Sequence, residues 1–149
     1  MQRQQLFIQY LHELEQYLPE QPHSLQEEID YFQTLRTHPN LIWVDITNET
    51  ELIGFVVIDS APPHADWHIV ETFIAPAYRR KQYMSSALQA FLAAHPGTYS
   101  LYILNRNEVA KQFWNSFFVK SNYVLRDDSL RDTCGKLYVF APASNNNMS

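Results

Sequence analysis

The sequence has one cysteine, no long apolar run and no signal-like N-terminus, and each absence argues against a class of protein. Cys134 stands alone, so an internal disulfide is excluded. No segment approaches the roughly 20 apolar residues that a membrane-spanning helix needs. The first residues show neither the basic region nor the apolar region of a secretory signal. We therefore expect a cytoplasmic protein without a signal peptide.

Two kinds of ligand are also disfavoured. The six histidines and the cysteine are scattered, without the spacing that metal sites require, so no metal ion is predicted. The formal net charge of −5 argues against a general nucleic-acid binder, which usually presents a basic face. We expect neither nucleic acid nor a membrane among the partners, and either a monomer or a homodimer.

The composition is sufficient for one hydrophobic core. Of the 149 residues, 46% are hydrophobic and 14% aromatic, which suits a single domain. The stretch 60–66 contains Pro62 and Pro63, but it is too short for a domain linker and is expected to be a stiff loop. We expect one domain over residues 1–143 and a disordered polar tail over residues 144–149.

Charges are distributed unevenly along the chain. Residues 1–66 carry a net charge of −9, and residues 67–149 carry a net charge of +4. Such an asymmetry would suit a cationic ligand on one side of the molecule and an anionic ligand on the other. A solvated surface with uneven charge explains the pattern equally well, so both interpretations stay open at this point.

The most informative segment runs from residue 70 to residue 92 and has the pattern of a strand, a turn and a helix. Strand propensity is high over residues 70–75, Pro76 ends the strand, and apolar residues follow at helical spacing from Met84. Three consecutive cations, residues 79–81, lie in the turn. Unpaired amides at a helix start beside cations stabilise a phosphate or pyrophosphate, so the segment predicts an anion site.

The rest of the chain supplies further elements. Helical spacing predicts three more helices, over residues 6–18, 25–35 and 109–121. Strands are expected at residues 41–47, 52–58, 99–104, 123–126 and 136–141. Ser24 and Glu27 predict a capping box, and Gly54 marks a bulge or a close backbone approach. The first two strands should form an antiparallel hairpin, and the strand, helix and strand over residues 70–104 should hold a parallel pair.

Three local motifs accompany this order of elements. The first is residues 52–58, Leu-Ile-Gly-Phe-Val-Val-Ile, in which a glycine precedes an apolar run. The second is residues 71–81, Glu-Thr-Phe-Ile-Ala-Pro-Ala-Tyr-Arg-Arg-Lys. The third combines Asn107-x-x-Ala110-x-x-Phe113-Trp114 with Asn122-Tyr123. Over roughly residues 41–141 the chain thereby resembles the GCN5-related N-acetyltransferase (GNAT) superfamily, with its glycine strand, its central strand before the acyl-coenzyme A (acyl-CoA) turn, and its Asn-x-x-Ala-x-x-Phe-Tyr helix.

The resemblance implies both a fold and an activity. The implied fold class is α/β (α+β), with a mixed central sheet of about six strands and helices on both faces. The implied activity is transfer of an acetyl group from acetyl-CoA to a primary amine of a small molecule or peptide, and the acidic first half would favour a cationic acceptor. An acyl-CoA-binding or protein-interaction module with weak or no catalysis is the alternative. A small enzyme that acts on a phosphate ligand is a more distant one.

The resemblance also implies which residues hold acetyl-CoA. Two lie on the central strand, whose backbone would pair with the pantetheine arm as a missing β partner does: Phe73 and Ile74. Two lie on the later helix: Asn107 and Trp114. Eight lie in the turn and the helix start, where the pyrophosphate would sit: Arg79, Arg80, Lys81, Gln82, Tyr83, Met84, Ser85 and Ser86.

The chain departs from the family pattern at two places. The family turn has glycines where Gln82 and Met84 stand, so the chain would be an atypical member with a reshaped phosphate cradle. The amides remain, because every non-proline residue donates one. Trp114 stands where many members have a tyrosine that protonates the leaving thiolate, which indole cannot do. Trp114 would then pack in the core or against the acyl arm, leaving Tyr123, Tyr83 or water as the acid.

Glu71 is the candidate general base. A carboxylate on this strand often deprotonates the amine in the family, and partial burial would raise its pKa toward the useful range. A solvent-facing residue or a salt-bridge partner is the alternative interpretation of Glu71. His68 should lie on the opposite face of the strand by alternation, and it is the second choice. The Ile74 amide is the expected donor to the tetrahedral oxyanion, and His64 and Asp66 lie in a loop that would border the acceptor.

Overall fold

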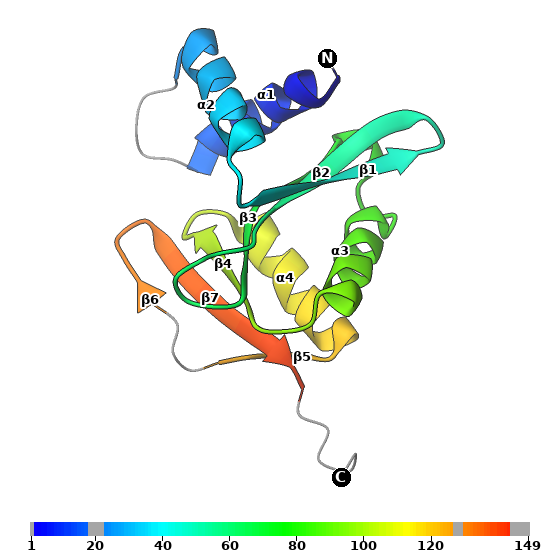
Figure 1. The fold of residues 1–149 in the computed structure, drawn as a ribbon, viewed down its shortest axis with the longest axis vertical. Helices are drawn as coiled ribbons and strands as arrows, with labels where there is room; N and C mark the ends of the chain where they lie inside the picture. Colours follow the sequence, from blue (N-terminus) through cyan, green and yellow to red (C-terminus); the bar gives the residue numbers. More distant parts are fainter. Residues whose placement is uncertain (1, 18–22, 127–129, 144–149) are drawn as a thin grey trace.

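The computed structural model describes residues 2–17, 23–126 and 130–143. Within these ranges the chain forms one twisted sheet with helices on both of its faces (Figure 1). The expected tail over residues 144–149 lies outside the described residues, so its disorder stays a prediction. No helix in the described part of the chain is long and apolar enough to cross a membrane.

The elements follow one another largely as the sequence predicts. The helices are α1 (Gln2–Leu14), α2 (Leu25–Thr37), α3 (Tyr83–Ala94) and α4 (Glu108–Ser121), with short 3-10 turns η1 (Glu15–Tyr17) and η2 (Pro76–Tyr78). The strands are β1 (Leu41–Asn48), β2 (Glu51–Asp59), β3 (Trp67–Ile74), β4 (Tyr99–Leu104), β5 (Tyr123–Leu125), β6 (Leu130–Arg131) and β7 (Gly135–Pro142). The capping box is confirmed, since Ser24 N–H donates to Glu27 at 2.8 Å and Glu27 N–H donates to Ser24 Oγ at 3.2 Å.

The strands form one mixed sheet. Six follow one another in the order β1-β2-β3-β4-β7-β5, and the two-residue β6 also pairs with β7. β3 and β4 are parallel and the other pairs are antiparallel, which confirms the predicted hairpin and the predicted parallel pair. The predicted fold class, a mixed sheet of about six strands with helices on both faces, is therefore confirmed. Gly54 marks both features expected of it: Ile53 beside it is an extra residue in the pairing with β1, and a Cβ at Gly54 would collide with the Phe73 carbonyl oxygen.

Each face of the sheet has its own core. Under α1 and α2 the core consists of Leu6, Phe7, Phe32, Leu35, Phe55, Val57 and Phe73. Under α3 and α4 a larger core includes Leu88, Phe91, Leu92, Trp114, Phe117, Phe118 and Phe140. From Phe55 to Ile58, β2 contributes alternate side chains to the two cores, which explains why this part of its sequence is a continuous apolar run.

A bulge in β3 decides which of its residues face α1 and α2. Val57 of β2 pairs with Glu71 and Ile58 pairs with Ile69, so Val70 is an extra residue on β3. Ile69 packs in the core under α3 and α4, whereas Val70 packs against the core under α1 and α2. The Glu71 side chain also faces α1 and α2, because it bonds Tyr10 and Tyr31 on these helices. Val70 and Glu71 therefore lie on the same face of the sheet although they are consecutive.

The bulge makes the prediction for His68 wrong. Simple alternation places His68 opposite Glu71, but the extra residue shifts the alternation by one. His68 Nδ1 lies 2.7 Å from Ser100 Oγ on β4, and both neighbours of Ser100 in the chain belong to the core under α3 and α4. Ser100 therefore faces the other way, and His68 lies on the same face as Glu71.

β3 and β4 separate soon after they begin. Among the described residues, their ladder consists of three pairs: Trp67 with Tyr99, His68 with Ser100, and Ile69 with Leu101. Residues 71–74 of β3 therefore run along an opening in the sheet instead of beside a paired strand. An inner strand edge of this kind can pair with an extended ligand.

Candidate active site

Two tyrosines hold the carboxylate of Glu71. The Tyr10 hydroxyl of α1 donates to Oε1, and the Tyr31 hydroxyl of α2 donates to Oε2 at 2.8 Å. Burial raises the pKa of Glu71, and the two hydrogen bonds partly offset that rise because they stabilise the charged form. The pKa of Tyr10 and of Tyr31 is raised by burial and by the adjacent carboxylate, so both stay protonated and donate. Glu71 is thus neither a solvent-facing residue nor a salt-bridge partner of a described cation.

A cavity of about 340 Å³ opens beside Glu71, between α1 and α2. Leu11 and Leu14 of α1 and Tyr31 of α2 form part of its wall, together with Glu71 itself. Sequence reasoning missed Tyr10 and Tyr31, because each is 40 or more residues from Glu71 and belongs to a helix stripe with the spacing of ordinary packing. This cavity gives a ligand access to the Glu71 carboxylate.

The turn after β3 has the backbone of an anion site. Arg80 and Gln82 adopt left-handed conformations, with φ of 63° and 72°, and α3 begins at Tyr83. The first amides of a helix have no partner inside the helix, so those of α3 point out of its N-terminus. A cavity of about 430 Å³ adjoins this N-terminus and is lined by Lys81, Gln82, Tyr83, Ser86 and Ala87, and across from them by Asp45, Ile46 and Thr47 of β1.

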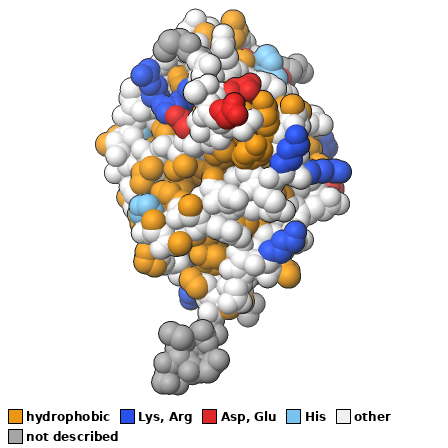
Figure 2. All heavy atoms as spheres, turned by 90° about the vertical axis from the view of Figure 1, so that its right-hand side faces the viewer, with side chains coloured by type: hydrophobic (Ala, Val, Ile, Leu, Met, Phe, Trp, Pro, Cys, Tyr) orange, Lys and Arg blue, Asp and Glu red, His pale blue; other side chains and the backbone are white. Residues whose placement is uncertain are grey.

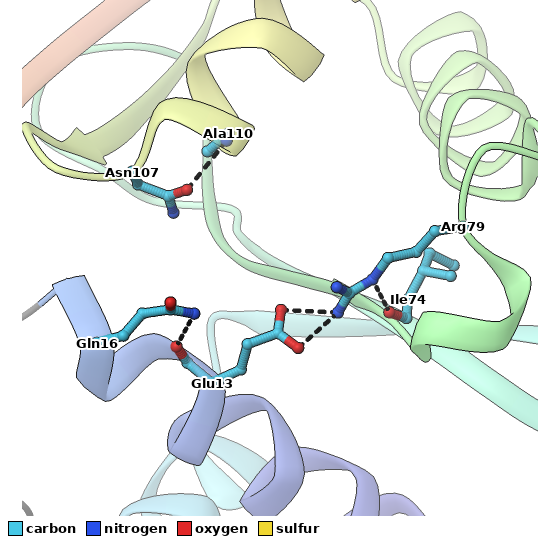
Figure 3. A network of polar contacts seen from close by, with 6 residues as sticks. All are labelled: Glu13, Gln16, Ile74, Arg79, Asn107 and Ala110. Carbon is cyan, nitrogen blue, oxygen red and sulfur yellow. Dashed lines mark hydrogen bonds and ion pairs between the residues drawn. The ribbon is translucent and has the colours of Figure 1, made fainter.

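The three predicted turn cations do not act together. Lys81 lines the cavity at the start of α3, whereas Arg79 turns toward α1. Arg79 Nη2 bonds both carboxylate oxygens of Glu13, at 2.7 and 2.9 Å, and Nε donates to the Ile74 carbonyl at 2.8 Å (Figure 3). Its guanidinium also lies 5.3 Å from the ring centre of Phe73. Figure 2 shows the side of the molecule that carries α3, on which Lys and Arg side chains lie in separate groups at both edges of the view.

The backbone of β3 offers alternate amides to the opening. The Ala75 amide donates to the Ile53 carbonyl of β2 at 2.8 Å, so the amides of Ile74 and Thr72 point away from β2, toward the side on which β4 has separated. The amide of Phe73 points to β2 instead. Of the two strand residues singled out from the sequence, Ile74 presents its backbone to the opening and Phe73 does not; Thr72 was missed.

The remaining predicted residues lie on the α4 side. Asn107 caps α4, with Oδ1 accepting from the Ala110 amide at 3.0 Å (Figure 3). Trp114 is 5% exposed and packs in the core under α3 and α4. Tyr123 stacks on Phe117 with ring centres 6.3 Å apart, and burial raises the pKa of its hydroxyl. At neutral pH that hydroxyl therefore carries its proton.

Several solved structures share this fold. An acetyltransferase from Thermus thermophilus is 17% identical, with 93% of this chain and 87% of that chain covered and a TM-score of 0.68. The microcin C7 self-immunity acetyltransferase MccE, in complex with acetyl-CoA and AMP, is 10% identical, with coverages of 93% and 83% and a TM-score of 0.62. The PaiA N-acetyltransferase from Thermoplasma acidophilum, in complex with coenzyme A, is 14% identical, with coverages of 76% and 69% and a TM-score of 0.52.

The chain therefore has the same fold as these three acetyltransferases. No curated protein sequence matches the chain significantly. The acetyltransferase (GNAT) family profile matches residues 7–118, and the chain belongs to that family. At the level of the family, this membership implies N-acetyltransferase activity.

Proposed function

We propose that the chain transfers an acetyl group from acetyl-CoA to a primary amine, with Glu71 as the general base. The observation that carries the proposal is the position of Glu71: a shielded carboxylate with a raised pKa, held by Tyr10 and Tyr31, at the wall of a cavity. The Ile74 amide lies three residues after Glu71 on β3 and points into the opening between β3 and β4. A base and an oxyanion donor thus lie on one strand.

The chain's groups fit acetyl-CoA at the turn and the strand edge. The free amides at the start of α3, with Lys81, Arg80 and the hydroxyls of Ser85 and Ser86, would hold the pyrophosphate. The backbone of Thr72 and Ile74 would pair with the pantetheine arm. Two structures with the same fold were solved with coenzyme A or acetyl-CoA, which supports this assignment by analogy.

We also propose that the turn is an atypical version of the family's. Gln82 has a left-handed φ of 72°, a conformation that glycine adopts without strain. The turn therefore keeps the backbone conformation suited to glycine, although glutamine stands at this position. Met84 lies inside α3, where its conformation is ordinary. The reshaping would therefore come from the two side chains, which narrow the approach of a phosphate to the amides, and not from a different backbone path.

Acetyl-CoA supplies a thioester carbonyl that an amine can attack. Glu71 would take the proton of the incoming ammonium, and the Ile74 amide would donate to the oxyanion as it forms. Tyr123, protonated at neutral pH, or Tyr83 at the start of α3 would give a proton to the leaving thiolate. Trp114 would shape the wall beside the acyl arm from within the core.

A second candidate is an acyl-CoA-binding module with weak or no catalysis. The engagement of Arg79 by Glu13 favours it, because one of the three turn cations is then neutralised by a carboxylate. Such a module would bind coenzyme A without using Glu71 as a base. The two candidates differ in turnover and not in binding.

The deciding experiment measures thiol release from acetyl-CoA with a panel of primary amines, for the native protein and Glu71→Gln. General base catalysis contributes about 100- to 10,000-fold, so Glu71→Gln should reduce turnover by a factor in that range. Asp30→Asn, at an exposed carboxylate of α2, is the matched control and should keep native turnover. Calorimetry with coenzyme A tests the binding that both candidates require: binding without turnover supports the module, and no heat with no thermal shift rules out both.

A further inference from the structure

The cavity beside Glu71 is strongly acidic. Its wall includes the carboxylates of Glu15, Glu27, Glu28 and Glu71, and His23 is the one basic side chain among the described residues that line it. Glu27 is already committed, since its carboxylate accepts from the Ser24 amide at 2.8 Å and that bond lowers its pKa. Each oxygen of Glu71 accepts one hydrogen bond from a tyrosine, and Glu28 bonds His12 through one oxygen, so the free acceptor capacity toward a ligand lies mainly at Glu15 and Glu28.

Among these residues, Glu28 most strongly indicates a cationic ligand. Its side chain is 3% exposed, which is rare for a carboxylate without a full set of partners. Oε1 lies 3.0 Å from His12 Nε2, and among the described residues Oε2 has no hydrogen-bond partner. Among the described residues no fully buried side-chain oxygen lacks a partner, so Oε2 is accessible, and Glu28 lines the cavity. A cation that enters the cavity would stabilise this carboxylate.

The carboxylates follow one another along the cavity. Glu28 precedes Tyr31 by three residues in α2, so it lies about 4.5 Å farther along the helix axis than the tyrosine that holds Glu71. Glu15 follows the end of α1, and its carboxylate oxygen lies within 4.8 Å of the ligand atoms of Glu28 and His12. Leu11 and Leu14 contribute an apolar wall to the same cavity.

We propose that the acceptor is a short aliphatic diamine, whose reacting amine lies at Glu71 and whose second ammonium lies at Glu28 and Glu15. The carbon chain between them packs on Leu11 and Leu14. The inference rests on the proposed function for the reaction, but the binding of a dication in this cavity can be tested without turnover. The acidic first half of the chain here supplies two of the three carboxylates that would hold one ligand.

The reaction balances with the groups at hand. The ammonium gives one proton to Glu71, and the resulting amine attacks the thioester carbon. The carbon–nitrogen bond forms, the carbon–sulfur bond breaks, and the nitrogen loses its second proton. The departing thiolate of coenzyme A takes up one proton, so the products are the amide, the thiol and the proton held by Glu71. The product is a mono-N-acetyl diamine, which keeps one ammonium at Glu28 but no longer has a charged amine at Glu71.

A divalent metal ion is the competing occupant. His12, Glu15 and Glu28 could each give one ligand atom, and these atoms lie within 4.8 Å of one another. A metal ion at that end would leave most of a cavity of about 340 Å³ unfilled and would make no use of Leu11 and Leu14. The diamine accounts for both ends of the cavity and for its apolar wall.

The first test is binding to the protein without acetyl-CoA, measured by calorimetry with diaminobutane and with butylamine as the matched monoamine. We expect the diamine to bind about tenfold more tightly, and Glu28→Gln to remove that difference. Glu15→Gln, at a more exposed position, should reduce it, and Asp30→Asn should leave it unchanged. Thermal unfolding of each variant shows whether Glu28→Gln is folded; if it is not, Glu15→Gln decides the test.

The second test is thiol release from acetyl-CoA with the same two amines. A diamine preference in kcat/KM that Glu28→Gln abolishes supports the inference. Equal binding of the two amines overturns it. Zinc binding that depends on His12 and leaves diamine binding unchanged also overturns it, because the second ammonium would then not lie at Glu28. Turnover of both amines at equal rates overturns the diamine assignment and leaves the proposed acetyl transfer intact. Tight diamine binding without any turnover supports the cavity assignment and rules out the proposed catalysis.

Discussion

Arg79 and Glu13 form a two-point ion pair that joins the turn after β3 to the first helix. Arg79 Nη2 bonds both carboxylate oxygens of Glu13, while Nε holds the carbonyl of Ile74 at the end of the strand (Figure 3). The first cation of the turn is therefore a structural link between α1 and β3. Lys81, two residues later, lines the cavity at the start of α3.

We predict that Lys81→Ala and Arg79→Ala have different effects. Lys81→Ala should weaken coenzyme A binding by about 3- to 10-fold at low salt and reduce its salt dependence, because a phosphate contact is lost. Arg79→Ala should weaken binding less and lower the free energy of unfolding by up to about 1 kcal/mol, because the ion pair is partly exposed. Calorimetry at two salt concentrations and urea unfolding measure both effects. Equal losses of affinity in the two variants would contradict the division of roles.

The two tyrosines should control the pH dependence of turnover. Their hydrogen bonds lower the pKa of Glu71 against the larger effect of burial, so Tyr31→Phe should raise that pKa. The rising limb of kcat/KM against pH, which reports the base in the free enzyme, should move to higher pH. Tyr10→Phe should move it in the same direction. Tyr102→Phe, which removes a hydroxyl that donates to Asp132 and not to Glu71, is the matched control and should leave the limb in place.

Glu71 should also make stability depend on pH. Its pKa in the folded chain lies above the ordinary value of 4.5, so the unfolded chain loses this proton first as pH rises. Stability from this group is full below pH 4.5 and is lost as pH rises through the folded pKa. The free energy of unfolding of native protein minus that of Glu71→Gln should therefore fall across this interval and then level off. A difference that is constant from about pH 4 to about pH 8 would show that the pKa is not raised.

Gln82→Gly should stabilise the fold. Gln82 has a left-handed φ of 72°, and a side chain in that conformation costs about 1 kcal/mol relative to glycine. The same substitution at Gln33, in the interior of α2, should destabilise by about 1 kcal/mol. A rise in unfolding temperature for Gln82→Gly and a fall for Gln33→Gly would identify backbone strain at Gln82. If Gln82→Gly also tightens coenzyme A binding, the glutamine side chain narrows the phosphate cradle; two losses of stability would refute the strain.

The sequence predicts the parts of this fold that depend on local pattern. The Ser24–Glu27 capping box, the hairpin and the parallel pair follow from spacing within a few residues, and the structure confirms them. The Asn107 cap of α4 is local in the same way, because asparagine is favoured directly before a helix. The motifs around Glu71 also led to the correct family.

The sequence does not predict contacts that depend on strand register or on segments far apart in the chain. Ile69 and Val70 are both apolar, so nothing in the sequence distinguishes regular alternation from the bulge that turns His68 toward the face of Glu71. Tyr10 and Tyr31 reach Glu71 across 61 and 40 residues, and Glu13 reaches Arg79 across 66. Such partners are set by the packing of α1 and α2 on the sheet, which no local pattern encodes.

The separation of β3 from β4 gives the strand a built-in reporter of ligand binding. The amide of Phe73 is directed at β2, whereas those of Thr72 and Ile74 are directed at the opening. In the free protein, hydrogen exchange should therefore be slow at Phe73 and fast at its two neighbours. An extended ligand that pairs with this edge would slow exchange at Thr72 and Ile74 and leave Phe73 unchanged. Three consecutive residues thus distinguish occupation of the opening from a general tightening of the fold.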